Sequence, residues 1–188
     1  IWSYIGYFFT LFTNVLILPF VMKWVSSPEL GLWYTFLSVG QIASIFEGAF
    51  STSISRNFTY AWSGMNEIRA NGHVAMANYS DPNFRLVISL MKTCKWLFAG
   101  ISIFVAVFFG VFGTSYIGYV ARSIDAYVWL TAWVLYAFAI VLNLYYCYWI
   151  TVLRGIGAMK EVQISSTISK IIYIVGAIAG LFTGGGII

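Results

Sequence analysis

Long apolar segments without charged side chains constrain this chain more than any other feature. No Asp, Glu, Lys or Arg occurs from Ala126 to Leu153, or from Trp96 to Ala121. A helix needs about 20 apolar residues to cross the hydrocarbon core of a bilayer, and both segments exceed that length. Neither shows the alternation of apolar and polar residues that is typical of membrane strands. The pattern therefore predicts an all-α integral membrane protein.

The same template predicts five spans and the start of a sixth. The chain begins inside an apolar segment and ends two residues after three consecutive glycines, so we expect it to be the front part of a longer protein. We expect residues 1–188 to form a single transmembrane helical bundle with a polar loop over residues 57–82. The predicted spans cover residues 2–25, 31–55, 86–117, 127–152 and 161–183.

Composition agrees with this class and excludes several others. The chain is 61% hydrophobic and 9% charged, whereas about a quarter of an ordinary soluble chain is charged. That balance excludes a disordered chain, a secreted disulfide scaffold and a nucleic-acid-binding domain. The net charge of +4 fits a membrane protein that collects Lys and Arg on its cytoplasmic side. Cys94 and Cys147 lie in apolar segments without other ligands nearby, so we expect two buried free thiols.

The placement of basic residues predicts the orientation. Loop 57–82 and the short connection 154–160 are separated by two spans and therefore lie on one side of the membrane. Seven basic residues belong to that side and two to the other, which predicts a cytoplasmic loop and a cytoplasmic amino terminus. The seven are Arg56, Arg69, Arg85, Lys92, Lys95, Arg154 and Lys160; the two are Lys23 and Arg122.

Polar residues at depth are the candidate functional residues, because a charge inside the bilayer costs a few kcal/mol unless it has a partner or faces a cavity. Glu47 lies roughly 13 Å inside the boundary marked by Arg56, and Lys170 roughly 15 Å beyond Lys160, at the rise of a helix. Both are expected to line a hydrophilic cavity, where they could pair. A structural ion pair, or a Lys170 that reaches back to the interface, is the alternative.

Four of the predicted spans have a polar and aromatic face, which favours a bundle around a wet, aromatic-lined space; helix packing is the alternative. Lys92 and Lys95 share one face of span three, where they would meet either an anion in a cavity or anionic lipid headgroups. The candidate cavity residues are Glu47, Arg56, Lys92, Lys95, Lys170, Asn14, Gln41, Asn143 and Tyr173. Span four adds Trp133, Tyr136 and Cys147 to the polar and aromatic faces.

Signs of catalysis are not found in the sequence. His73 is the only histidine, and the six acidic residues are dispersed, so no nucleophile, acid–base or metal-ligand pattern emerges. We expect neither an enzyme nor a cofactor. A membrane-embedded polysaccharide polymerase or ligase would need a larger loop on the outer side than residues 114–125 provide.

Several motifs, in order along the chain, resemble those of the Wzx-type polysaccharide and O-antigen flippases, which belong to the multidrug/oligosaccharidyl-lipid/polysaccharide exporter superfamily. The first is Pro28-Glu29-Leu30-Gly31-Leu32-Trp33, followed by Phe46-Glu47-Gly48 and Arg56. The family's usual Asp is Glu47 here. The others begin at Tyr60-Ala61-Trp62, Asp81-Pro82-Asn83 and Leu153-Arg154-Gly155.

This resemblance implies the amino-terminal lobe of a two-lobed transporter in the bacterial inner membrane. Such a protein flips a polyprenyl-diphosphate-linked oligosaccharide across the bilayer by alternating access, and Glu47 and Arg56 match its span-two motif. Expected partners are this lipid-linked substrate, membrane lipids, a coupling ion (proton or sodium) and membrane proteins of polysaccharide assembly, but no nucleic acid. A drug/cation antiporter of the same superfamily is the alternative transporter, and it would favour an acidic cavity.

Overall fold

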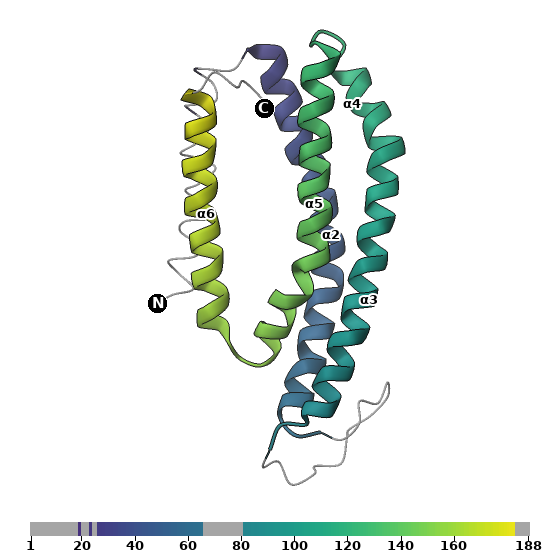
Figure 1. The fold of residues 1–188 in the computed structure, drawn as a ribbon, viewed down its shortest axis with the longest axis vertical. Coiled ribbons are helices and arrows are strands. Elements are labelled where there is room, and N and C mark those ends of the chain that lie inside the picture. Colours follow the sequence, from purple (N-terminus) through teal and green to yellow (C-terminus); the bar gives the residue numbers. More distant parts are fainter. Residues whose placement is uncertain (1–18, 20–22, 24–25, 66–80, 183–188) are drawn as a thin grey trace. The chain divides into compact units, whose positions relative to one another are not determined.

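The structure is a computed structural model that describes residues 19, 23, 26–65 and 81–182 (Figure 1). Those residues form helices and short connections, with no strand among them. The helices are α2 (Ser27–Trp62), α3 (Phe84–Phe108), α4 (Thr114–Val120), α5 (Ala126–Gly155) and α6 (Met159–Phe182), and a π-helical segment, Phe109–Gly113, joins α3 to α4. The all-α prediction is therefore confirmed for the described part of the chain.

Local side-chain bonds mark where two of these helices begin. Glu29 accepts hydrogen bonds from the backbone N–H of Ser26 at 3.0 Å and from its hydroxyl at 2.7 Å, which is half of a capping box at the start of α2. Asn83 caps α3, because its Oδ1 accepts from the Leu86 N–H at 3.1 Å. Asn83 satisfies a backbone donor at the start of α3, and Glu29 fixes the first turn of α2. Both residues therefore have a structural role.

Glycines at positive φ end α2 and α5 in the same way. Gly64 has φ 85° and Gly157 has φ 83°, a region that costs glycine nothing. After α5, the Ala158 N–H donates to the Leu153 carbonyl at 2.9 Å and the Gly157 N–H donates to that of Arg154 at 3.2 Å. This is a Schellman motif, and the residues after α2 repeat it. Gly155-Ile156-Gly157 therefore forms the turn that ends α5.

The chain divides into two compact units, each assembled from separate segments. Unit 1 comprises Ile1–Gln41, Ala106–Ile140 and Lys160–Ile188, and unit 2 comprises Ile42–Val105 and Val141–Met159. The single bundle expected over residues 1–188 remains a prediction.

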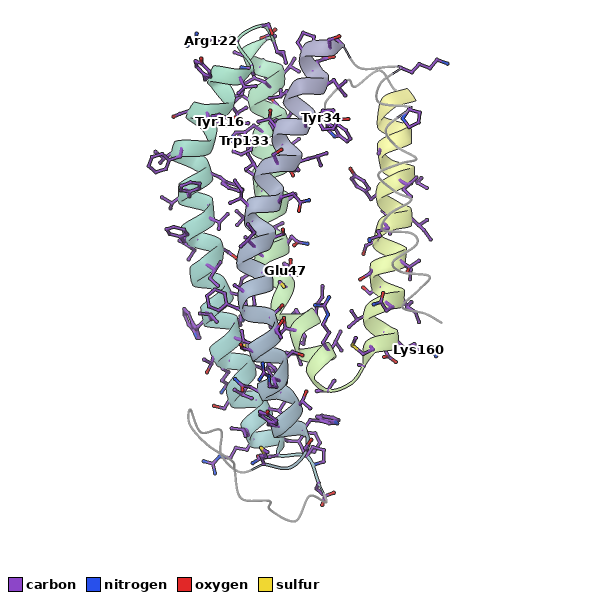
Figure 2. The ribbon with its side chains drawn as sticks, turned by 180° about the vertical axis from the view of Figure 1, so that it is seen from behind. Tyr34, Glu47, Tyr116, Arg122, Trp133 and Lys160 are labelled. Carbon is purple, nitrogen blue, oxygen red and sulfur yellow. The ribbon has the colours of Figure 1, made fainter. Side chains whose placement is uncertain are left out.

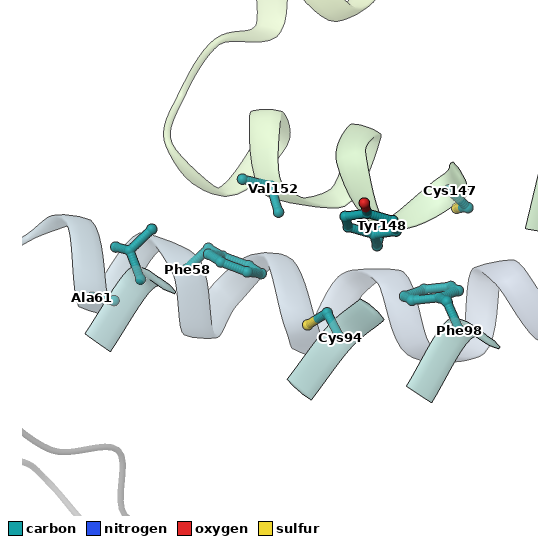
Figure 3. Close-up of a cluster of buried hydrophobic side chains, with 8 residues drawn as sticks. Phe58, Ala61, Cys94, Phe98, Cys147, Tyr148 and Val152 are labelled. Atoms are coloured by element: carbon teal, nitrogen blue, oxygen red, sulfur yellow. The ribbon is translucent and has the colours of Figure 1, made fainter. Parts of the chain in front are cut away.

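Unit 2 is held by an apolar cluster to which α2, α3 and α5 all contribute (Figure 3). Phe58 of α2 and Phe98 of α3 are fully buried, and Cys94 lies between them along the cluster. Asn83 links the ends of two helices, because its Nδ2 donates to the Met65 carbonyl at 3.1 Å and its N–H to that of Ala61 at 3.0 Å. The other cluster members are Ala61, Val87, Cys147, Tyr148 and Val152.

A close approach of α5 to α2 completes unit 2. A Cβ at Gly155 would meet the Phe58 Cβ, and it would lie 2.7 Å from the Ser55 carbonyl oxygen. The Thr59 hydroxyl donates to the Gly155 carbonyl at 2.8 Å, so the same residue also carries an interhelical hydrogen bond. Only glycine lets the two backbones come this close, which is a common device of packed membrane helices.

Two described helices are long and apolar enough to cross a membrane: the continuous helix Phe84–Val120 and Ala126–Gly155. Only 28% and 17% of their most apolar windows are buried inside the protein, whereas the core helix of a soluble protein is mostly buried. Large apolar side chains therefore cover their outer surfaces, where a soluble protein would carry charge. Examples are Trp96, Ile103, Phe104, Val107, Phe112, Val134, Leu135 and Phe138.

The other predicted spans have a mixed outcome. Residues 31–55 and 161–183 lie in α2 and α6, which are helical, while their crossing of a membrane remains a prediction. Residues 2–25, apart from 19 and 23, lie outside the described part. The helices extend beyond two of the predicted spans: α2 continues to Trp62, into the predicted loop 57–82, and α4 continues to Val120. Gly64 at positive φ stops α2, whereas α4 ends at Val120, still within the charge-free stretch that reaches Ala121.

Candidate functional site

Glu47 is the acidic side chain that the sequence placed at depth, and the structure gives it a specific partner. It lies half-buried on α2, within unit 2 (Figure 2). The thiol of Cys147 on α5 faces this carboxylate and interacts with it as a hydrogen-bond donor. Cys147 is buried, so the thiol reaches Glu47 from inside the helix packing. A carboxylate that leaves water needs such a donor, because an unpaired charge in an apolar setting is costly.

The surroundings of Glu47 on α5 are polar over two turns. The Thr151 hydroxyl donates to the Cys147 carbonyl at 3.2 Å, and it also interacts with the thiol. The exposed guanidinium of Arg154 acts electrostatically on the same thiol. Glu47, Cys147, Thr151 and Arg154 thus form one connected polar group between α2 and α5. We call it the Glu47 group.

The sequence identified Glu47 and listed Cys147 on a polar face, but it predicted a different partner. Lys170 lies half-buried on α6, which belongs to unit 1, whereas Glu47 belongs to unit 2. The pairing of these two charges remains a prediction. The sequence held a signal for this thiol. Cys147 precedes the boundary residue Arg154 by about two turns, which places it at a depth similar to that of Glu47.

The remaining basic candidates are on the surface of unit 2. Arg56 of α2 is exposed, as are Lys92 and Lys95 of α3. Asn143 is also exposed and lies one turn before Cys147 on α5. Asn143 is therefore the predicted candidate of unit 2 that lies nearest to Cys147 along α5.

The candidates of unit 1 are fewer. Gln41 is exposed on α2. Tyr173 of α6 is half exposed and interacts electrostatically with Tyr136 of α5. Asn14 lies outside the described residues. Tyr136 and Tyr173 therefore link α5 and α6 within unit 1.

An aromatic centre around Trp133 is the feature of unit 1 that the sequence did not predict. Trp133 is only 1% exposed and contacts Phe36 and Phe109, each with ring centroids 5.6 Å apart (Figure 2). Phe36 stacks on Tyr136 at 5.3 Å and 14°. The Trp133 indole N–H donates to the Thr114 hydroxyl at 3.0 Å. The expected wet, aromatic-lined space was thus wrong for Trp133, because its ring fills the packing between helices.

The π-helical segment is what receives this indole. The Phe109 carbonyl, five residues back, accepts both the Thr114 backbone N–H, which is the wider bond of the π turn, and the Thr114 hydroxyl at 3.2 Å. Gly113 lies beneath the ring, and a Cβ there would come within 2.5 Å of the indole. The two glycines of Phe109-Gly110-Val111-Phe112-Gly113 were the sequence signal for this irregular turn.

The side chains at these groups offer binding chemistry. Cys94 and Cys147 are free and buried, as predicted. Within residues 26–65 and 81–182, no three His, Cys, Asp or Glu side chains come together in a way that could hold a metal ion. His73 lies outside this part of the chain. A carboxylate, a thiol and a hydroxyl in one group can bind a cation or a proton or accept hydrogen bonds from a polar solute.

Comparisons with known protein families, with curated proteins and with solved structures gave no match. The residues of the chain and their geometry are therefore the basis for a functional assignment.

Proposed function

We propose that this chain is part of a multi-pass membrane transporter of the bacterial inner membrane, which flips a polyprenyl-diphosphate-linked oligosaccharide by alternating access. The observation that carries the proposal is the Glu47 group, a connected polar group inside helices whose outer surfaces are apolar. Nature retains ionisable residues at such positions mainly where a substrate or an ion passes. The resemblance of the sequence motifs to Wzx-type flippases supplies the substrate class.

The proposed substrate needs three kinds of contact. Its diphosphate cannot enter hydrocarbon without a replacement for its hydration, and basic side chains provide one. Arg56 in unit 2 and Lys170 in unit 1 are separate candidates for this contact. Tyr173 offers an aromatic face on which a sugar ring can stack, and Gln41 and Asn143 offer amide groups for its hydroxyls. The polyprenyl tail stays in the bilayer and leaves between helices.

The Glu47 group has a separate role in this scheme. Glu47 is half-buried and takes part in a hydrogen bond that depends on its own charge, so binding of a proton or sodium ion there would weaken the bond from Cys147. Since Cys147 lies on α5 and Glu47 on α2, such a change acts on the packing of two helices. This is the kind of local event that a transporter can use to couple an ion gradient to a change of access.

The test is export of surface polysaccharide in the native cell with the chromosomal gene replaced by variants. Lys170→Ala and Arg56→Ala are expected to reduce export and to cause lipid-linked repeat units to accumulate, at unchanged protein levels. Lys160→Ala is the matched control, because Lys160 is an exposed lysine of α6 outside the proposed site. Normal export with both site variants would contradict the site assignment. Normal export after deletion of the gene would contradict the function.

A drug/cation antiporter of the same superfamily is the second candidate, and the half-buried carboxylate of Glu47 favours it. In that case Glu47→Gln would abolish extrusion of cationic dyes while leaving polysaccharide export intact. The two readouts can be measured in the same strains, so they separate the candidates directly.

A further inference from the structure

The first three turns of α3 have one face that points away from the core of unit 2. At about 100° per residue, Val87, Cys94 and Phe98 share one side of the helix, and all three are buried. Arg85, Lys92 and Trp96 fall on the opposite side, and all three are exposed. These basic side chains therefore point outward from unit 2 and not into its packing.

The chemistry of this outward face changes in a fixed order along the helix. It begins with the two basic residues, continues with Trp96, which is 80% exposed, and then reaches Ile103, which is 65% exposed. A helix that enters a bilayer places basic side chains at the headgroups, an indole at the interface and aliphatic side chains in the hydrocarbon, and this face has the same order. From Trp96 to the exposed Tyr116 the same helix rises by roughly 30 Å, the thickness of the hydrocarbon core.

The charge of unit 2 indicates the sign of its partner. Its described residues hold five basic side chains and two acidic ones, a formal net charge of +3. All five basic side chains are exposed, whereas the acidic Glu47 is half-buried and bonded to Cys147. An anionic partner is thus complementary to this surface. The basic residues are Arg56, Arg85, Lys92, Lys95 and Arg154, and the acidic ones are Glu47 and Asp81.

We infer that the outward face of α3, formed by Arg85, Lys92, Trp96 and Ile103, is a lipid-binding surface on which Arg85 and Lys92 bind the phosphates of anionic phospholipids. Arginine matches a phosphate with a planar pair of donors, and lysine approaches it as a point charge while its stem lies on apolar neighbours. Trp96 sets the depth of the helix at the glycerol region. The inference holds whatever the protein transports, and it places Lys92 outside the transport site.

The first experiment measures lipid preference in bilayers. The whole chain is reconstituted in phosphatidylcholine with trace spin-labelled phosphatidylglycerol or spin-labelled phosphatidylcholine, and the immobilised fraction of each label is compared. We expect phosphatidylglycerol to be preferred, and the preference to fall about twofold or more in Arg85→Gln/Lys92→Gln and at high salt. Arg85→Lys/Lys92→Arg should retain it.

The matched control is Arg122→Gln, a charge loss elsewhere on the surface; Arg122 lies 4.5 Å from the Tyr119 ring centroid. Its lipid preference should equal that of the wild type. Equal immobilisation of both lipids by the wild type, or an equal loss in Arg122→Gln, would overturn the inference. Circular dichroism of each variant confirms that the helices are intact.

The second experiment identifies what covers the face. A nitroxide is attached at Ile103→Cys, and the buried positions of Cys94 and Cys147 direct labelling to the new thiol. Contact with lipid predicts high collision with oxygen and low collision with a water-soluble nickel chelate. Low collision with both would mean that a second copy or another protein covers the face. High collision with nickel would mean a water-filled cavity. Either result would refute lipid contact.

Discussion

Replacing Gly155 with alanine tests whether the close approach of α5 to α2 stabilises unit 2. The new Cβ would meet the Phe58 Cβ and lie 2.7 Å from the Ser55 carbonyl oxygen and 3.4 Å from the Phe58 Cα. Two of these three atoms belong to the α2 backbone, so a side-chain rotation cannot make room. The helices must move apart, which also stretches the 2.8 Å bond from Thr59 to the Gly155 carbonyl.

The magnitude follows from three contributions. Overpacking of a tight contact costs about 1–3 kcal/mol. Loss of the Thr59 hydrogen bond costs about 1 kcal/mol. Alanine favours the helix over glycine by about 1 kcal/mol, which opposes that loss. The free energy of unfolding should therefore fall by about 1–3 kcal/mol in Gly155→Ala.

The assay is unfolding in mixed detergent micelles with increasing dodecyl sulfate, followed by circular dichroism. Gly100→Ala is the matched control, because a Cβ at this helical glycine would meet nothing within 4 Å. It should gain up to about 1 kcal/mol from helix propensity. Thr59→Val isolates the hydrogen bond and should lose about 1 kcal/mol. A Gly155→Ala variant as stable as Gly100→Ala would refute the reasoning, since it would mean that the two helices do not touch at Gly155.

Three further predictions concern local contacts. Asn83→Ala should lower the free energy of unfolding by about 1–2 kcal/mol in the same assay, whereas Asn83→Asp should lose less because its carboxylate still caps α3. Thr114→Val should lower the free energy of unfolding by about 1–3 kcal/mol, because it leaves the indole N–H of Trp133 without its acceptor. A blue shift of the tryptophan fluorescence with no loss of stability would argue against that bond. In the folded chain, Cys94 and Cys147 should react with a maleimide far more slowly than after denaturation, and rapid labelling of either thiol would contradict its burial.

Much of the helical layout was predictable because its signals are local. Asn83 as a helix start depends on a side chain that reaches only three residues along the chain. Gly157 as a helix stop depends on a backbone angle that glycine adopts freely. The end of α2 lies beyond the predicted span because hydropathy falls near Arg56, while the stop signal, Gly64, comes two turns later.

The candidate site was only partly predictable. Glu47 was identified from its depth alone, since the cost of a charge in hydrocarbon does not depend on the fold. Its bond with Cys147 depends on the rotation of α2 against α5, and helix periodicity leaves that rotation open. For the same reason Trp133 was assigned to a wet face although its ring is buried.

The sequence by itself determined the helical class, the apolar outer surfaces and most helix ends, because each depends on composition or on bonds within a few residues. Only the tertiary structure decided which polar groups meet: Glu47 with Cys147, the Thr59 hydroxyl with Gly155, and the Trp133 indole with Thr114. Each of these contacts joins residues far apart in the chain, and its geometry is set by the packing of whole helices.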